Sequence, residues 1–161
     1  KEMCGICGII NINNSKIDPE IANNIKTSLE HREPDNSSIK HISETVSLVH
    51  TRLAIIDIED RSNQPFHSDD NRYWIVFNGE IYNYLEVKAN LVKQGYQFET
   101  ASDTEVLIKG WHAKGIKILD ELESLGLRAI LFLKSSFVNS PDLSSYQLDC
   151  GGLFFSYSLN L

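Results

Sequence analysis

The sequence predicts an α+β domain in which strands and helices share one hydrophobic core. Aromatic and β-branched runs, of which Tyr73 to Phe77 is the clearest, alternate with segments whose apolar residues have helical spacing. No internal repeat or linker separates them, and 161 residues are enough for one domain with a sizeable core.

The N-terminal part is predicted to begin with a buried strand and a helix. Residues 4–12 are apolar and interrupted by glycine, which is typical of a buried strand. Asp18 and Pro19 indicate a helix start, with Asp as N-cap and Pro at the first helical position. This helix extends to about residue 30, and its apolar residues are expected to face a sheet: Ile21, Ile25 and Leu29. Two strands follow, over 44–50 and 53–58, with a tight turn at 50–52 between them. A polar loop then covers 60–71.

The next part is predicted to be a strand followed by helices. After the strand at 73–77, Asn83 resembles a capping residue and Gly95 ends that helix. Ser102 and Gly115 delimit a second helix in the same way, and a third helical stretch covers 116–122. Further strand character is confined to 127–133.

The last residues, 134–161, are serine-rich and lack any clean periodicity. The sequence therefore divides into a domain over 1–133 and a divergent tail over 134–161, which we expect to be weakly ordered.

Composition narrows the classes of function. The net charge is −7 and no cluster of Lys and Arg is present, which argues against nucleic acid or an anionic membrane as a partner. The longest apolar run, 129–133, is far too short to cross a bilayer, and no signal peptide is recognisable. Three cysteines do not make a disulfide framework, so a cytoplasmic location is expected.

Cys4 and Cys7 form a C-x-x-C pair close to the first residue. A zinc site needs two further ligands at matching spacing, and a redox pair normally opens a helix, whereas this pair lies in a predicted strand. The redox or metal module stays a distant alternative, and Cys7 is interpreted as a small buried residue. If Cys4 were N-terminal, its α-amine, with an ordinary pKa of about 7.7–8.0, would be a built-in general base.

Other candidate residues each have an ordinary structural interpretation. Asn78-Gly79 after an apolar strand is typical of a type I′ hairpin turn, although an Asn amide and a Gly N–H could also stabilise an oxyanion. Asp103 follows the cap at Ser102 and suits the first turn of a helix. Arg52 in a turn is most often solvated.

Six segments together, in order and spacing, resemble the class II glutamine amidotransferase domain, whose nucleophile is the N-terminal residue, and in particular the glutaminase domain of asparagine synthetases. The resemblance covers about residues 3–123. The matching segments are Met3 to Ile9, His31 to Asp35, His50 to Asp57, Gln64-Pro65, Tyr73 to Asn83 and Ser102 to Glu105.

The resemblance implies a four-layer αββα sandwich of two antiparallel sheets between helices, incomplete toward the C-terminus. It implies that Cys4 attacks the side-chain amide of L-glutamine, and that Asn78 and Gly79 hold the oxyanion. Arg52 would bind the substrate's α-carboxylate, whereas Glu80 and Asp103 would accept its α-ammonium. The implied products are glutamate and ammonia.

No cofactor and no metal are expected, and the chain holds no pyrophosphate loop, so the ammonia acceptor would be a separate synthetase domain or subunit. Lys1, Glu2 and Met3 precede Cys4, and Glu33 replaces the glycine of the family's His-Arg-Gly-Pro-Asp motif. Glu33 adds bulk and a negative charge that would raise the pKa of a nearby thiol. The alternative from another class is a remnant without activity that acts as a binding module.

Overall fold

A computed structural model describes residues 5–11, 13, 15–30, 36–52, 63–133, 144–149 and 152–157. The elements of the first half are β1 (Gly5–Ile10), α1 (Pro19–Glu30), β2 (Asn36–Ser43), β3 (Val46–Arg52), β4 (Phe66–His67) and β5 (Tyr73–Ile81). Those of the second half are α2 (Tyr84–Lys93), α3 (Asp103–Lys114), the 3₁₀ helix η2 (Gly115–Glu121), β6 (Ser124–Leu133), β7 (Ser144–Asp149) and β8 (Gly152–Tyr157).

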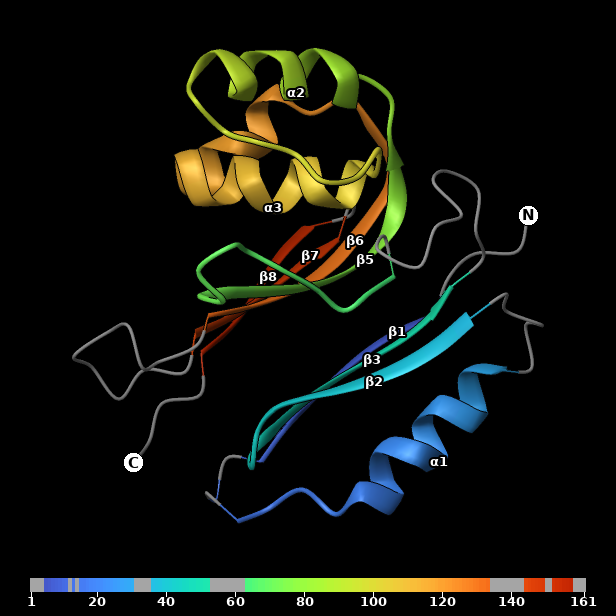
Figure 1. Ribbon diagram of the computed structural model, residues 1–161. Coiled ribbons are helices and arrows are strands. Elements are labelled where there is room, and N and C mark those ends of the chain that lie inside the picture. Colours follow the sequence, from blue (N-terminus) through green and yellow to red (C-terminus); the bar gives the residue numbers. More distant parts are fainter. Residues whose placement is uncertain are drawn as a thin grey trace.

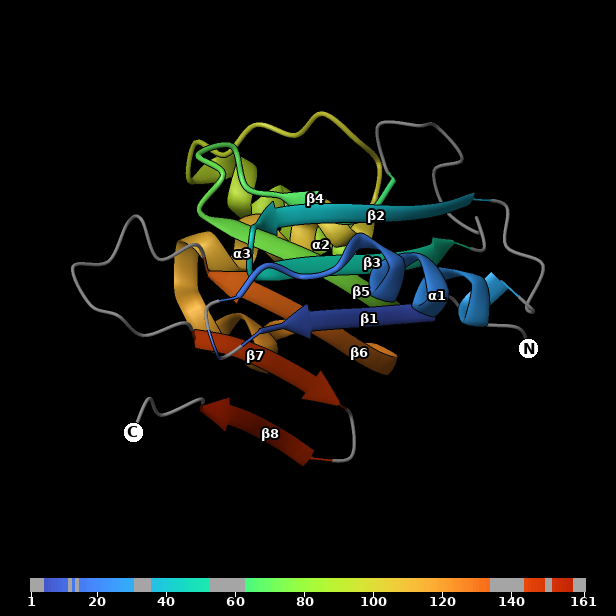
Figure 2. The same ribbon diagram turned by 90° about the horizontal axis from the view of Figure 1, so that it is seen from below.

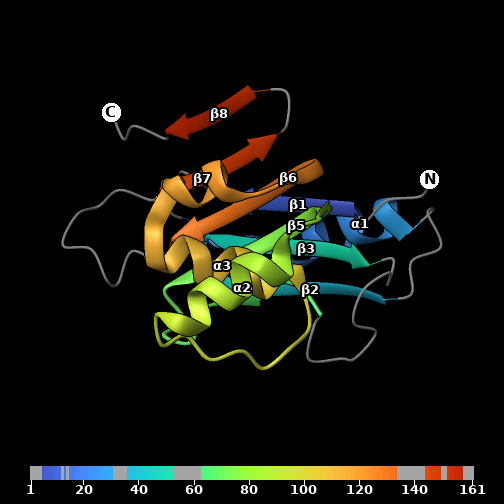
Figure 3. The same cartoon turned by 90° about the horizontal axis from the view of Figure 1, so that it is seen from above.

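These elements stack in four layers (Figure 1). The helix α1 covers the outer face of a three-stranded antiparallel sheet with the order β1-β3-β2, seen from below in Figure 2. The second sheet is also antiparallel and has the order β4-β5-β6-β7-β8. The helices α2 and α3 cover the part of it formed by β5 and β6 (Figure 3). The predicted αββα sandwich is therefore confirmed.

The first sheet differs in detail from the prediction. The segment expected to turn at 50–52 continues β3, with Thr51 opposite Gly5 of β1 and Arg52 opposite Asn36 of β2. The prediction of a turn was wrong because pairing on both sides buries the polar His50 and Thr51 inside the sheet. The strand β2 was not predicted, and the strand predicted over 53–58 lies outside the described residues.

The strand β5 runs on past Phe77 to Ile81, so the type I′ hairpin interpretation of Asn78-Gly79 was wrong. The register against β6 shifts at this point: Asn78 lies opposite Arg128 and Glu80 lies opposite Leu125. One residue of β5, Gly79, therefore faces two residues of β6. Such a bulge interrupts the ladder and redirects the backbone groups next to it.

Alternation along β5 divides its side chains between two cores. Ile75, Phe77 and Ile81 are buried against the helices, together with the apolar residues of α2 and α3. Trp74 and Val76 are buried between the two sheets, with Leu48 of β3. Since successive side chains point to opposite faces, Asn78 continues the face of Trp74 and Val76 toward the first sheet.

Two helix starts agree with the sequence and one does not. The Asp18 carboxylate accepts the Glu20 N–H at 2.9 Å, and the Ser102 hydroxyl accepts the Thr104 N–H at 3.1 Å, so both residues are N-caps. Asn83 does not cap α2 with its side chain. Its amide instead donates to the Glu121 carbonyl and accepts the Glu123 N–H, which joins the end of β5 to the start of β6.

The apolar face of α1 was predicted only in part. Ala22 is fully buried, and Ile25 and Leu29 are partly buried. Ile21, however, is 50% exposed, so the prediction that it faces the sheet was wrong. A helix that covers one sheet buries a narrow stripe, and Ile21 lies outside that stripe.

The strand predicted at 127–133 is confirmed as part of β6. Within 134–161, two further segments form a hairpin, β7 and β8, that extends the second sheet beyond the helices (Figure 3). Sequence patterning did not predict these strands, while the division of the chain at residue 133 stays a prediction. No helix in the described part of the chain is long and apolar enough to cross a membrane.

Candidate functional site

Four backbone segments meet at one end of the sandwich. β1 begins there, and β3 ends there because Gly5 pairs with Thr51. β5 ends and α3 begins at the same end (Figure 1). The Ile81 N–H donates to the carboxylate of Asp103, at 3.2 Å, which fixes the start of α3 against the end of β5. The topology thus gathers residues that are far apart in the sequence.

The start of β1 is tightly constrained. The Gly5 N–H donates to the Thr51 hydroxyl at 3.0 Å in a buried position. A Cβ on Gly5 would lie 2.5 Å from the Thr51 Oγ1 and 3.1 Å from Leu29, so only glycine fits without a shift of its neighbours. This contact fixes the direction in which the chain enters β1. The preceding residue, Cys4, lies outside the described residues.

Asn78 contributes a side-chain amide at this end. The residue is only 8% exposed. Its amide can both donate and accept hydrogen bonds. An amide on the face between the two sheets, beside the bulge at Gly79, is suited to stabilising a ligand oxygen.

Asp103 and Glu80 form the acidic part of the site. Burial raises the pKa of the Asp103 carboxyl against hydrogen bonds from the Ile81 and Thr104 amides, and the negative charge of Glu80 raises it further. A buried carboxylate that also feels the negative charge of a second acid favours the approach of a cation. A primary ammonium group satisfies both the charge and the hydrogen-bonding capacity of such a pair.

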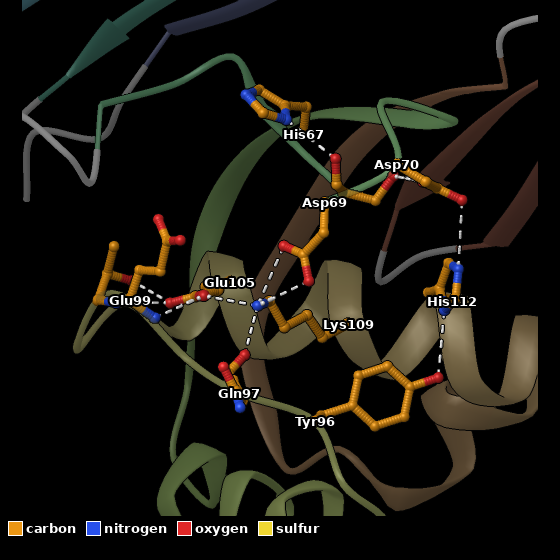
Figure 4. A network of polar contacts seen from close by, with 11 residues as sticks. His67, Asp69, Asp70, Tyr96, Gln97, Glu99, Glu105, Lys109 and His112 are labelled. Atoms are coloured by element: carbon orange, nitrogen blue, oxygen red, sulfur yellow. Dashed lines mark hydrogen bonds and ion pairs between the residues drawn. The ribbon is translucent and has the colours of Figure 1, made fainter.

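A buried polar network holds the loop that leads into α3 (Figure 4). Glu105 accepts hydrogen bonds from the N–H of Glu99 and from the N–H and hydroxyl of Thr100. Burial alone would raise the pKa of Glu105, but these bonds, together with Lys109, outweigh it and lower that pKa below its ordinary value. The sequence did not predict this role, since Glu105 was named there only as the last residue of a matching segment.

Lys109 continues the network one turn further along α3. Its ammonium is 3.1 Å from the Glu105 carboxylate and 3.2 Å from that of Asp69, and it donates to the Gln97 carbonyl. The loop between α2 and α3 is therefore held at Gln97 by Lys109 and at Glu99 and Thr100 by Glu105. Because the Thr100 hydroxyl also accepts the Ser102 N–H, these contacts fix the position of Ser102 and hence of Asp103.

The same helix carries a second, more exposed cluster (Figure 4). The imidazole of His112 lies 3.4 Å from the Asp70 carboxylate and 3.1 Å from the Tyr96 hydroxyl. The slight burial of Asp70 would raise its pKa, but hydrogen bonds from Ser68 and Arg72 and the charge of His112 lower it. This cluster lies near the turn that precedes β5, so it belongs to the scaffold.

Of the other residues that the sequence singled out, the structure describes some and not others. Arg52 ends β3 opposite Asn36. Glu33 lies outside the described residues. Cys7 lies within β1 opposite Val49, partly buried, and burial raises the pKa of its thiol. The described residues contain no group of three or more His, Cys, Asp or Glu side chains that could hold a metal ion.

The fold is that of an amidotransferase of the N-terminal-nucleophile type. The structure aligns with the glutamine phosphoribosylpyrophosphate amidotransferase of B. subtilis, solved in complex with ADP and GMP, with a TM-score of 0.53 and 20% sequence identity. The alignment covers 92% of this chain and 31% of that chain. Residues 3–133 match the glutamine amidotransferase domain family, and the chain belongs to this family.

Individual relatives narrow the comparison to asparagine synthetases. The chain is 41% identical over 109 residues to asparagine synthetase [glutamine-hydrolyzing] 1 of Bacillus subtilis (strain 168). The aligned residues cover 66% of this chain and 17% of that protein. It is 33% identical over 153 residues to putative asparagine synthetase [glutamine-hydrolyzing] 2 of Methanocaldococcus jannaschii. Here the aligned residues cover 84% of this chain and 29% of that protein. The chain thus spans less than a third of the length of either relative.

Proposed function

We propose that this chain hydrolyses the side-chain amide of L-glutamine and releases glutamate and ammonia. The observation that carries the proposal is the position of the buried Asn78, beside the bulge at Gly79 and next to the acids Glu80 and Asp103. The family match supplies the reaction class, since it extends over residues 3–133. The neighbouring acids Glu80 and Asp103 supply a binding site for an amino acid's ammonium group.

The reaction begins with Cys4 as nucleophile. Its α-amine takes the thiol proton, and the sulfur forms a bond to the amide carbon of glutamine, whose oxygen becomes an oxyanion. The Asn78 amide and the Gly79 N–H donate to this oxygen, and one such donor is worth about 2.7–4 kcal/mol. The carbon–nitrogen bond then breaks, and the protonated amine returns its proton to the departing ammonia. Water hydrolyses the γ-glutamyl thioester and restores the thiol.

The amine can act only if Cys4 is the first residue of the mature chain. With Lys1, Glu2 and Met3 present, the nitrogen of Cys4 is an amide, which cannot accept a proton at neutral pH. The proposal therefore includes removal of these three residues. The residue after Cys4, Gly5, is held at the start of β1 by the Thr51 hydroxyl.

The amino acid is recognised by side chains of positive and of negative charge. Arg52 binds the α-carboxylate with its planar guanidinium, which matches a carboxylate in two parallel hydrogen bonds. Asp103 and Glu80 bind the α-ammonium. The distance between these groups then selects for the length of glutamine, because the amide must reach Cys4 while both ends are held.

The ammonia passes to an acceptor that is held by a separate synthetase domain or subunit. The relatives with the glutamine-hydrolyzing name are asparagine synthetases, and this chain spans only 17% to 29% of the two described above. We place the activity in the cytoplasm, where a reducing environment keeps a nucleophilic thiol intact.

Hydrolysis assays on chains of defined N-terminus test the proposal. The chain is produced so that intact mass confirms a start at Cys4, and glutamate and ammonia are measured in equal amounts. Cys4→Ala is expected to abolish the activity, whereas Cys7→Ala is the matched control and is expected to lower stability only. A chain that starts at Cys4 and produces no glutamate, or a Cys4→Ala variant with full activity, would refute the proposed function.

A further inference from the structure

The side chain of Gln64 bonds to both backbone groups of one residue in β5. Its Oε1 accepts the Phe77 N–H, and its Nε2 donates to the Phe77 carbonyl at 3.2 Å. This pair of bonds is the one by which a neighbouring strand normally pairs with a residue in an antiparallel ladder. The short strand β4 pairs with β5 only at Ile75 and Trp74. The Gln64 amide therefore continues the ladder where the edge strand is absent.

The same residue also contacts the layers on either side of the second sheet. Its Nε2 donates to the Thr104 hydroxyl at 3.1 Å, in the first turn of α3. Its backbone carbonyl accepts a hydrogen bond from the hydroxyl of Ser38 in β2 of the first sheet. Gln64 thus joins β5 to the first sheet and to α3. Two of its three partners, Phe77 and Thr104, are direct neighbours of the candidate site residues Asn78 and Asp103.

We propose that Gln64 is a positioning residue for the oxyanion donors Asn78 and Gly79, an inference that rests on the proposed function. The carbonyl of Phe77 and the nitrogen of Asn78 belong to one planar peptide, so holding the carbonyl fixes the orientation of Asn78. The bulge leaves Gly79 without a single partner in β6, although Asn78 and Glu80 on either side of it are paired. Gln64 adds a second constraint on β5, from the opposite edge of that strand, immediately before the bulge.

The expected effect is on turnover and much less on substrate binding. A displacement of about 1 Å at a reacting group can lower the rate on the order of 10²-fold. Asp103, by contrast, keeps its own anchors at Ile81 and at the cap formed by Ser102. We therefore expect Gln64→Met, which preserves length and removes every side-chain hydrogen bond, to lower kcat about 10- to 100-fold and to change KM for glutamine less than about threefold.

Two further variants separate positioning from general stability. Ser68→Ala is the matched control, because the Ser68 hydroxyl accepts the Tyr73 N–H at the opposite end of β5. It is expected to lower stability with kcat unchanged. Gln64→Glu keeps an acceptor for the Phe77 N–H and loses the donor to the Phe77 carbonyl, so it is expected to have an intermediate kcat.

A double variant tests whether Gln64 acts through Asn78. If it does, adding Gln64→Met to Asn78→Ala lowers kcat by a smaller factor than Gln64→Met does alone, because one of the two donors to be positioned is already absent. Fully multiplicative losses in the double variant, or equal loss of kcat in Ser68→Ala and Gln64→Met at equal stability, would overturn the proposal.

Hydrogen exchange gives a result that does not depend on activity. In Gln64→Met, or in Gln64→Leu if the former does not fold, the Phe77 amide loses its acceptor and is expected to exchange at least tenfold faster than in the parent chain. The Tyr73 amide serves as the internal reference and is expected to be unchanged. Unchanged exchange at Phe77 would overturn the positioning role, whereas a parent chain without glutaminase activity but with this exchange pattern would overturn only the proposed function.

Discussion

The carboxylate of Asp103 accepts a hydrogen bond from the backbone amide of Ile81 at 3.2 Å, although the two residues are 22 positions apart in the sequence. The bond is buried and joins the first turn of α3 to the last residue of β5. It holds an acid whose pKa is raised by its own burial. Burial disfavours the ionised form of this acid, and an approaching cation would offset that cost.

Asp103→Asn is therefore predicted to stabilise the fold at neutral pH and to weaken glutamine binding about 10- to 100-fold. A carboxyl whose pKa is raised on folding stabilises below its ordinary pKa, and this contribution is lost as the pH rises through the raised value. The variant's advantage is thus present at pH 7 and disappears toward about pH 4. Urea denaturation at both pH values, with glutamine titration at neutral pH, checks the prediction.

Asp70→Asn is the control, because its effect on stability at pH 7 is expected to be opposite to that of Asp103→Asn. The pKa of Asp70 is lowered in the fold, so its ionised form contributes stability that is lost as the pH falls through the lowered value. This variant is predicted to be less stable than the parent at pH 7 and equally stable in acid. If both variants shift in the same direction at pH 7, the electrostatic account of Asp103 is wrong.

Asn78→Ala is predicted to lower kcat for glutamine hydrolysis by about 10²–10³ with little change in KM. The reason is that the amide is proposed to bind the oxygen only once it carries charge. Steady-state kinetics measure the effect. Asn83→Ala serves as control, since Asn83 joins β5 to β6 through Glu121 and Glu123 and should cost stability with kcat preserved. A change in KM alone would make Asn78 a plain substrate contact.

Thr51→Val is predicted to impair the site through the start of β1. The substitution keeps the shape of the side chain and removes the hydroxyl that accepts the buried Gly5 N–H, which costs about 1–3 kcal/mol. Thr51→Ser keeps that hydroxyl and should retain kcat. Thermal unfolding and glutaminase assays on both variants check this, and equal activity of Thr51→Val and the parent would show that the bond does not orient Cys4.

Lys109→Met is predicted to destabilise the fold by about 3 kcal/mol, because it leaves the buried Glu105 carboxylate without its ion-pair partner. Lys114→Met is the comparison, since Lys114 pairs with Glu121 in a more exposed position and should cost less than about 1 kcal/mol. Denaturant midpoints distinguish the two. Equal losses would mean that burial does not set the strength of the network around Glu105.

Local signals predicted the helix starts well and the strand ends poorly. Asp18 and Ser102 are caps whose hydrogen bonds lie within two residues, so the sequence alone indicates them. The dipeptide Asn78-Gly79 has the same local pattern in a hairpin turn and in a bulged strand. The difference is the presence of β6 about 50 residues later, which no short pattern contains.

The candidate site was predicted through resemblance rather than through spacing. Asn78 and Asp103 each have an ordinary local interpretation, and only their place in a known set of motifs assigned them a role. Gln64 belonged to the same set, yet it received no role because its partners are backbone atoms 13 positions away and a side chain 40 positions away. Side-chain contacts to backbone leave no signature in the partner's residue type.

The pairing of β1 with β3 has a consequence for the order of events in synthesis. In the described residues, β1 lies at the edge of its sheet and pairs only with β3, and its first bond, from Gly5 to Thr51, spans 46 positions. During synthesis β1 therefore has no strand to join until Val46–Arg52 have left the ribosome. Closure of the first sheet is expected to wait for β3, whatever else of the chain has already folded.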